Sequence, residues 1–298
     1  MVEIGEANPN MIVAVADVAT SSRVNGFAEE YPERFYNLGV AEQNLMSFSA
    51  GMAHEGFMPY AFTFAPFASM RACEQVRTDI CYNGLSVRIL ANYAGYSGAE
   101  SGATHSALED VAIMASMGNM TVIEPGSPHQ IVDVLKATIE WDGPIYIRMG
   151  KEATRSLYDP SVKYEIGKAL IPRDGKDGAF IASGIVVHHA VEAAQRLWED
   201  FKVEIRVVDM HTIKPLDAEA VANAAATGNV IAAQDHSIIG GLGSHVAAQL
   251  AQDGLGINFK ILGSPDEYVP VATPAFLYSR NHYDADGLYT EMKQMLKL

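Results

Sequence analysis

The chain is poor in the features that mark secreted, membrane-bound or metal-binding proteins. It has only two cysteines among its 298 residues. Cys73 and Cys81 lie in one segment with helical periodicity, about 12 Å apart at the helical rise, which excludes a disulfide between them. Two thiols are too few for a zinc site. No apolar run approaches the roughly twenty residues of a membrane span, and the N-terminus lacks a signal-peptide pattern. We therefore expect a cytoplasmic protein without membrane contact.

Basic residues are also scarce. Lys and Arg number 21 against 36 Asp and Glu, which gives a formal net charge of −15. Binding to nucleic acid requires clustered basic side chains, so this class of partner is excluded. An anionic small-molecule substrate would need a local basic pocket. Five histidines show no ligand spacing, and we expect no metal site within the chain: His188, His189, His211, His236 and His245.

What the chain does have is a regular alternation of strand and helix patterns, with 49% hydrophobic residues. In the first half, strands are expected at 11–16, 86–91, 120–123 and 144–148, and helices at 40–55, 64–82, 106–117 and 128–141. In the second half, strands are expected at 179–182, 203–208, 229–233 and 257–262, and helices at 185–201, 217–226 and 243–253. Such alternation predicts parallel sheets covered by helices.

The two series are separated by a charged segment with scattered Gly and Pro. We therefore expect two α/β domains, at 1–150 and 176–298, joined by a linker at 151–175.

The segment Asn37–Asn44 places the ionisable Glu42 in an apolar frame at the junction of a strand and a helix. Burial of a carboxylate is costly, so the residue is expected to have a partner or a chemical task. The structural alternative is that Glu42 only supplies negative charge to the first turn of a helix.

Three motifs in one order carry a family resemblance: Gly-Val-Ala-Glu-Gln around Glu42, the run from Gly56 to Phe64, and Gly-Ala-Thr-His ending at His105. Together they resemble the pyrimidine-binding domain of transketolases, which use thiamine diphosphate. The segments 208–217 and 235–244 resemble the C-terminal domain of the same family. The resemblance covers essentially the whole chain and implies two domains of those types.

The resemblance implies specific roles around the cofactor. Glu42 would hydrogen-bond the pyrimidine N1′ and favour the imino tautomer, by which the cofactor activates itself. Phe64, Phe67 and Met70 match the family positions that enclose the pyrimidine ring, although Met70 replaces the usual Tyr. Their helical spacing alone would suggest ordinary core packing.

The loop from Tyr93 to His105 is rich in Gly and Ala, which lets its backbone approach a ligand. By resemblance, His105 contacts substrate and is catalytic. Three neighbours are implied to read the sugar: Tyr93, Glu100 and Ser101. Tyr93 and Ser101 stand where the family has His and Asp, so cofactor class is better supported by the sequence than substrate identity.

Two further positions are implied to lie near an anionic group of the substrate. Ser21 follows the first strand, where parallel sheets place ligand loops. Lys151 aligns with a frequent family Arg, and the preceding run from Arg148 adds basic charge. A Lys ammonium is a single point charge, whereas an Arg guanidinium can bind a phosphate through two parallel hydrogen bonds.

The family's Gly-Asp-Gly motif, which holds the cofactor diphosphate and its divalent metal, is absent. The chain therefore resembles the second half of a split transketolase. This implies a partner subunit that holds the diphosphate with Mg²⁺ or Ca²⁺, an α2β2 heterotetramer, and transfer of a two-carbon ketol unit between sugar phosphates or modified sugars.

Two other enzymes share this layout: deoxyxylulose-phosphate synthase and the β subunit of a 2-oxoacid dehydrogenase. In another class, the chain could be a noncatalytic binding or regulatory subunit. The joint presence of Glu42, Phe64, Phe67 and His105 argues against the last alternative.

Overall fold

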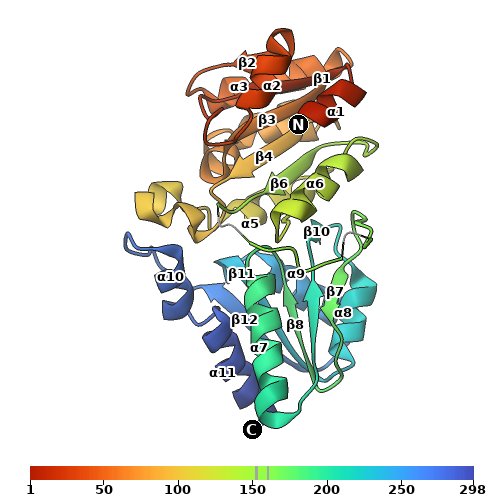
Figure 1. Cartoon of the computed structure of the whole chain (residues 1–298), viewed down its shortest axis with the longest axis vertical. Coiled ribbons are helices and arrows are strands. Elements are labelled where there is room, and N and C mark those ends of the chain that lie inside the picture. The colour runs from red at the N-terminus through yellow and green to blue at the C-terminus, as the bar shows by residue number, and fades with distance from the viewer. Residues whose placement is uncertain (152–153, 160) are drawn as a thin grey trace.

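The computed structural model describes residues 1–151, 154–159 and 161–298, and it places two sheets one after the other along the long axis of the molecule (Figure 1). Residues 152, 153 and 160 of the expected linker lie outside the described residues. Most of the first sheet and its helices lie in the upper part of Figure 1, near the N-terminus, and the second sheet lies in the lower part, near the C-terminus. Both sheets are mostly parallel, as the strand and helix alternation predicts.

The first sheet has seven strands in the order β10-β5-β6-β4-β3-β1-β2. Its strands are β1 Met11–Val15, β2 Phe35–Asn37, β3 Met58–Phe64, β4 Arg88–Asn92, β5 Thr121–Ile123, β6 Ile145–Arg148 and β10 Thr212–Lys214. Strand β1 is buried along its whole length, which explains its continuous apolar sequence. Strands β2 and β3 pair with opposite sides of β1, so the strand order changes direction there.

The helices of the first half differ in regularity. The α-helices are α1 Val2–Ala7, α2 Asn25–Glu30, α3 Glu42–His54, α4 Cys73–Gln75, α5 Asp110–Ser116 and α6 Pro128–Ala137. The expected helix 64–82 is shorter and broken into π and α turns, with π segments at Phe67–Arg71 and Val76–Cys81. Short 3-10 helices occur at Pro32–Arg34, Tyr96–Ser101 and Ala103–His105.

The second sheet has five strands in the order β12-β11-β8-β9-β7. Its strands are β7 Leu170–Arg173, β8 Gly178–Ala182, β9 Ile205–Asp209, β11 Asn229–Ser237 and β12 Asn258–Ser264. The helices are α7 Val186–Phe201, α8 Ala218–Ala225, α9 Leu242–Gln252, α10 Pro274–Arg280 and α11 Ala285–Leu296. The segment expected to be a linker thus contains an edge strand, β7, which is antiparallel to β9.

The two halves of the chain interleave at one strand. Strand β10 follows β9 in sequence, yet it pairs antiparallel with β5 of the first sheet. Ile213 of β10 is buried in the same core cluster as Val122 of β5. Among the described residues, no helix is long and apolar enough to cross a membrane.

Candidate active site

Most of the predicted site residues follow the carboxyl ends of strands in the first sheet. Ser21 follows β1, Glu42 begins α3 after β2, and Phe64 ends β3. Tyr93 follows β4, and Lys151 lies beyond β6. Carboxyl ends of parallel strands meet at one edge of the sheet, where open α/β sheets bind ligands. The topology therefore explains how residues far apart in sequence reach one edge.

Glu42 is buried, with 2% of its side chain exposed, and it pairs with an arginine. Nη1 of Arg71 donates a hydrogen bond of 2.8 Å to Oε2 of Glu42. The Arg71 side chain remains 45% exposed, and its guanidinium lies 4.1 Å from the centre of the Phe67 ring. The carboxylate is thus held beside an aromatic ring by a group that still reaches water.

Four rings gather next to this pair. The Phe64 ring centre lies 4.4 Å from that of Tyr93, 5.9 Å from that of Phe67 and 5.9 Å from the imidazole of His105. His105 also meets Phe67 edge-on at 5.4 Å. Its Nδ1 lies 2.9 Å from the Thr104 hydroxyl. The structure therefore brings Phe64, Phe67, Tyr93 and His105 into one aromatic cluster.

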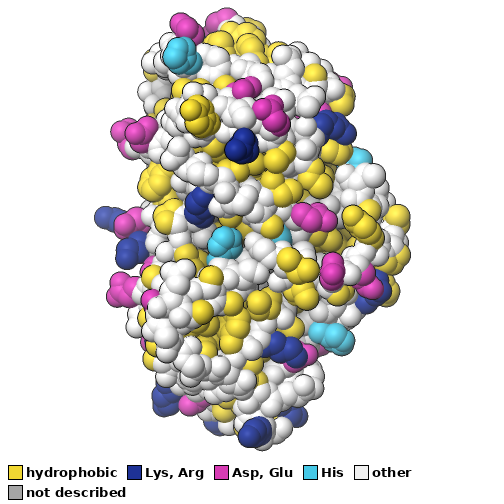
Figure 2. Space-filling model, turned by 180° about the vertical axis from the view of Figure 1, so that it is seen from behind, with side chains coloured by type: hydrophobic (Ala, Val, Ile, Leu, Met, Phe, Trp, Pro, Cys, Tyr) yellow, Lys and Arg dark blue, Asp and Glu magenta, His cyan; other side chains and the backbone are white. Residues whose placement is uncertain are grey.

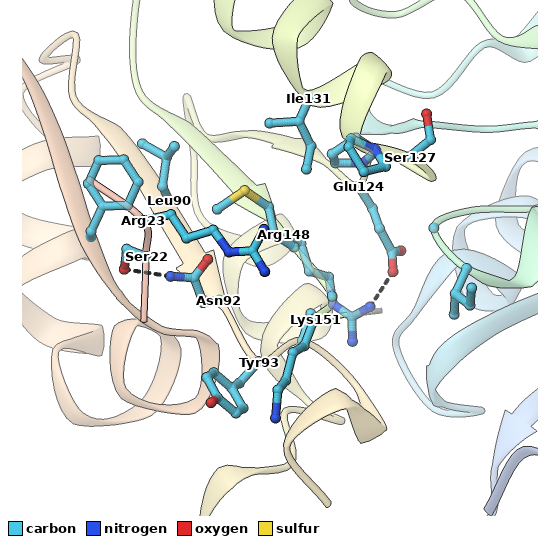
Figure 3. A pocket seen from close by; sticks show the side chains of 18 of the residues that line it. Ser22, Arg23, Leu90, Asn92, Tyr93, Glu124, Ser127, Ile131, Arg148 and Lys151 are labelled. Carbon is cyan, nitrogen blue, oxygen red and sulfur yellow. Dashed lines mark hydrogen bonds and ion pairs between the residues drawn. The ribbon is translucent and has the colours of Figure 1, made fainter. Parts of the chain in front are cut away.

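Tyr93 connects this cluster to a neighbouring cavity. Its backbone φ of +60° lies in the left-handed region, which bulky residues rarely adopt. Such strained backbone is often found at functional sites. Nζ of Lys151 lies 5.5 Å from the centre of the Tyr93 ring, and Figure 3 shows the two side chains next to each other.

The cavity has a volume of about 590 Å³, and three of the predicted substrate residues line it: Ser21, Tyr93 and Lys151. Arg23 adds a second basic side chain on the lining (Figure 3). Nδ2 of Asn92 donates to the Ser22 hydroxyl at 2.7 Å. The cavity continues to Ser127, Gly184 and Asp235, so residues of the second half form part of its wall.

Arg148 also lines the cavity, but its guanidinium is paired with two buried carboxylates. Its Nε donates to Oδ2 of Asp110 at 2.9 Å, and its Nη1 donates to Oε1 of Glu124 (Figure 3). Its Nη2 donates to the carbonyls of Ala107 and Asp235 at 2.9 and 2.6 Å. The sequence suggests that Arg148 supplies charge to a phosphate, and the structure instead buries it between two carboxylates, leaving Lys151 and Arg23 as the basic groups on the exposed side.

The remaining predicted residues lie at the edge of these groups. Met70 is 45% exposed. Glu100 and Ser101 are exposed on the loop before His105, and neither lines the cavity. The structure thus arranges the predicted residues in two adjoining groups that share Tyr93: the aromatic cluster beside Glu42, and the cavity with Ser21 and Lys151.

Comparison with known protein families identifies the family of this chain. The family described as "Transketolase, pyrimidine binding domain" matches residues 1–156, and "Transketolase, C-terminal domain" matches residues 167–286. The chain belongs to the transketolase family. It is a two-domain member of that family, in agreement with the resemblance and the α/β fold class expected from the sequence.

Two relatives of similar length are named as subunits of transketolases. The chain is 31% identical to a subunit of the apulose-4-phosphate transketolase of Phocaeicola vulgatus, over 100% of this chain and 95% of that protein. It is 35% identical to a subunit of the 6-deoxy-6-sulfo-D-fructose transketolase of Clostridium sp. (strain MSTE9), over 85% of this chain and 79% of that protein.

A solved structure has the same fold throughout. It is described as a split gene transketolase in the form of an inactive β4 tetramer, with 38% identity and a TM-score of 0.91. The match covers 100% of this chain and 95% of the other. Members of the transketolase family depend on thiamine diphosphate, and the prediction of this cofactor class is confirmed at the level of the family.

The residues of the site fit the pyrimidine half of that cofactor. Glu42 offers a buried carboxyl group close to the aromatic cluster, and pockets for small molecules combine aromatic walls with a few polar groups in this way. The described residues contain no group of three or more His, Cys, Asp or Glu that could hold a metal.

Sequence reasoning misses two features of the site. Arg71 directly follows the aromatic motif, and only the fold brings it to Glu42. Arg23, whose φ is +55°, looks in the sequence like part of an ordinary loop after the first strand. A search for basic residues within a few positions of the predicted site residues would find both.

Proposed function

We propose that this chain is the pyrimidine-side subunit of a split transketolase, a transferase that moves a two-carbon ketol unit between sugar phosphates or modified sugars. The observation that carries the proposal is the position of Glu42. It is buried to 2% exposure, lies next to an aromatic cluster, and is paired with an arginine that can move into water. Burying a carboxylate is costly, and buried ionisable groups are frequent at functional sites, so this position favours a chemical task for Glu42.

In this proposal the residues around Glu42 serve the cofactor. Glu42 would hydrogen-bond N1′ of the pyrimidine, and Phe64 and Phe67 would contact the faces and edge of the ring, with Met70 beside them. The cofactor itself supplies the carbanion chemistry of ketol transfer. His105 would contact the substrate at the reacting end, because its ring lies against Phe64 and Phe67. There it would hold or move a proton.

The cavity would hold the anionic end of the substrate. Lys151 and Arg23 provide positive charge on its lining, and Ser21 and Ser22 provide hydroxyl donors. Three further residues would contact the sugar between its reacting end and its anionic end: Tyr93, Glu100 and Ser101. Ser101 and Tyr93 favour a nonstandard donor: a branched, deoxy or otherwise modified sugar that carries a phosphate or sulfonate. The names of the relatives, which include subunits of an apulose-4-phosphate and a sulfo-fructose transketolase, support this class.

A partner subunit is the second part of the proposal. The chain lacks the Gly-Asp-Gly motif, so the diphosphate and its Mg²⁺ or Ca²⁺ would be held by an N-terminal subunit in an α2β2 heterotetramer. Large apolar side chains are exposed near the site, among them Val40 at 72% and Met70 at 45%. Figure 2 shows hydrophobic side chains gathered across the middle of one face. Exposed apolar patches of this kind are typical of interaction surfaces.

Reconstitution tests the partner requirement. Purified alone, the chain is expected to show no ketol transfer and only weak binding of thiamine diphosphate. Addition of a cognate diphosphate-binding subunit with Mg²⁺ or Ca²⁺ should restore both. The related split-gene structure described as an inactive β4 tetramer supports this expectation. Robust activity of the isolated chain would contradict the split-subunit proposal.

A substrate panel tests the specificity. The reconstituted enzyme is compared on xylulose 5-phosphate, fructose 6-phosphate and modified ketoses with a phosphate or sulfonate. Loss of a partner for a buried polar group costs roughly 1–3 kcal/mol, so selectivity for the modified sugars should be about tenfold to a hundredfold in kcat/KM. A strong preference for the two ordinary sugars would show that Ser101 and Tyr93 do not redirect specificity. A pyruvate decarboxylation assay separates the proposal from the synthase and dehydrogenase alternatives.

A further inference from the structure

The loop that carries His105 is closed at its base by its own backbone. The amide of Gly95 donates to the carbonyl of Ala107 at 3.0 Å, and the amide of Ala107 donates to the carbonyl of Gly95 at 3.1 Å. Between these residues, the 95–107 loop contains Glu100, Ser101 and His105. Whatever fixes the base of this loop therefore also fixes the predicted substrate residues.

The base is attached to Asp235, which lies on β11 of the second sheet. Oδ2 of Asp235 accepts a hydrogen bond of 2.9 Å from the amide of Tyr96. On the other side of the base, the carbonyls of Asp235 and Ala107 accept from the same guanidinium nitrogen of Arg148. A Cβ on Gly95 would lie 2.0 Å from Oδ2 of Asp235, so this close contact requires glycine.

Three tyrosines surround the Asp235 carboxylate. Tyr278 donates to its Oδ2 at 3.1 Å, and Tyr283 donates to its Oδ1 at 3.0 Å. The third, Tyr96, belongs to the loop and makes its own bonds: its hydroxyl donates to the Ser264 hydroxyl at 2.6 Å and accepts from Nδ2 of Asn281 at 2.9 Å. Its ring stacks on that of Tyr283 with the centres 6.2 Å apart. The loop is thus anchored by both a backbone and a side-chain contact.

We propose that Asp235 and Tyr96 are positioning residues, through which the second domain holds the 95–107 loop and sets the place of His105 against Phe64 and Phe67. The consequence for catalysis rests on the proposed function, whereas the consequence for the order of the loop does not. Glu42, Phe64 and Phe67 belong to other elements. Weakening the anchor therefore raises the KM for the sugar and leaves the affinity for thiamine diphosphate unchanged.

The sharpest test is a matched pair of substitutions, Tyr96→Phe and Tyr158→Phe. Each removes one tyrosine hydroxyl that is hydrogen-bonded to the second half of the chain, but only Tyr96 belongs to the loop, and the Tyr158 hydroxyl donates to Asp209 and not to Asp235. In the isolated chain, hydrogen exchange followed by mass spectrometry should show faster exchange across 95–107 for Tyr96→Phe alone. In the reconstituted enzyme, Tyr96→Phe should raise the KM for the sugar about tenfold, the order of magnitude expected when a buried hydroxyl and its two hydrogen bonds are lost. The Kd for thiamine diphosphate should stay within about twofold for both variants.

Equal changes in exchange and KM for the two variants would overturn the proposal, because they would indicate a general loss of stability. Asp235→Asn provides a second test, since an amide nitrogen would face one of its donors. Faster loop exchange in Asp235→Asn supports the proposal, and unchanged exchange overturns it. If Asp235→Asn does not fold, the tyrosine pair decides. If the wild-type complex shows no ketol transfer, the proposed function fails, and the exchange experiment still decides the anchoring.

Discussion

Glu42 and Glu124 are both buried carboxylates next to strands of the first sheet, exposed to 2% and 4%, and their surroundings differ sharply. The partner of Glu42, Arg71, is 45% exposed. Glu124 accepts from Arg148, from the Ser183 hydroxyl at 2.6 Å and from Nε2 of Gln234 at 2.6 Å, and all three of these donors are buried.

Burial alone therefore does not distinguish the carboxylate proposed to serve the cofactor from one that belongs to a structural network. Glu124 belongs to a network between the two sheets, in which Arg148 also binds Asp110 and burial is compensated by fixed donors. The partner of Glu42 is half exposed, so Arg71 would not become a buried unpaired charge if the carboxyl group turned to another hydrogen-bonding partner. What differs between the two carboxylates is the exposure of their partners: Arg71 is half exposed, whereas Arg148 is buried.

The largest effect on turnover is expected for substitution of Glu42. Glu42→Ala should lower the turnover of the reconstituted enzyme by about 10²–10⁴-fold, the usual contribution of a positioned acid or base. Folding and partner assembly should be largely intact, because the freed Arg71 already reaches solvent. Glu42→Gln keeps the shape and loses the ionisable group, so it should also be slow. Steady-state kinetics and size-exclusion chromatography provide the measurements.

Glu55→Ala is the matched control, because Glu55 follows the end of the same helix and is exposed. Its turnover should equal that of the wild type. Near-normal rates for Glu42→Ala would show that the assigned role of Glu42 is wrong.

Disrupting the network around Glu124 is expected to lower the stability of the fold. Arg148→Met leaves Asp110 and Glu124 buried without their cation, which should cost about 3–5 kcal/mol in the free energy of unfolding. Urea unfolding measures the change. In the control Arg196→Met, the arginine of a surface pair with Asp286 is replaced, and the cost should be about 1 kcal/mol or less. Similar costs for the two variants would contradict the distinction between the network and the surface.

A third carboxylate extends the comparison to pH, with a smaller effect. Asp209 is buried and accepts hydrogen bonds from the hydroxyl of Tyr158 at 2.6 Å and from Nε2 of Gln130 at 2.9 Å. Burial raises the pKa of Asp209 to about 6. A raised pKa means that the folded protein binds the proton more tightly, so the contribution of Asp209 to stability is full below about pH 4 and is lost as the pH rises through 6.

Asp209→Asn removes this titration. Relative to the wild type, the variant should therefore have a higher free energy of unfolding at about pH 7.5 than at about pH 4.5, by up to about 3 kcal/mol. Thermal unfolding at the two pH values measures it. The same difference at both values would exclude ionisation of Asp209 as the cause.

The sequence predicts the long regular elements well and the short ones poorly. Buried apolar runs such as β1 Met11–Val15 and β8 Gly178–Ala182 are recognised by composition. Strand β3 is missed because Pro59, which disfavours a strand, lies inside it and because Phe64 fits the start of a helical pattern. Strands β2 and β10 have three residues each, too few to show a period, and only pairing with neighbours defines them.

For the site, the motifs identify residues that the fold brings together, such as Phe64, Tyr93 and His105. Their chemical roles stay predictions. The network around Arg148 has no local signal, because its partners Glu124 and Asp235 are 24 and 87 positions away. The cost of leaving these charges unpaired is a property of the folded interior, which a linear pattern does not display.

The placement of β10 has a consequence for dividing this protein. Expressed without the second half, the first sheet would lose the strand that covers β5 and would present an unprotected edge with free amide and carbonyl groups. It would also lose Ile213 from its core. Exposed edges of this kind promote aggregation, so the boundary between the two family matches is a poor place to cut the chain or to graft either half onto another protein.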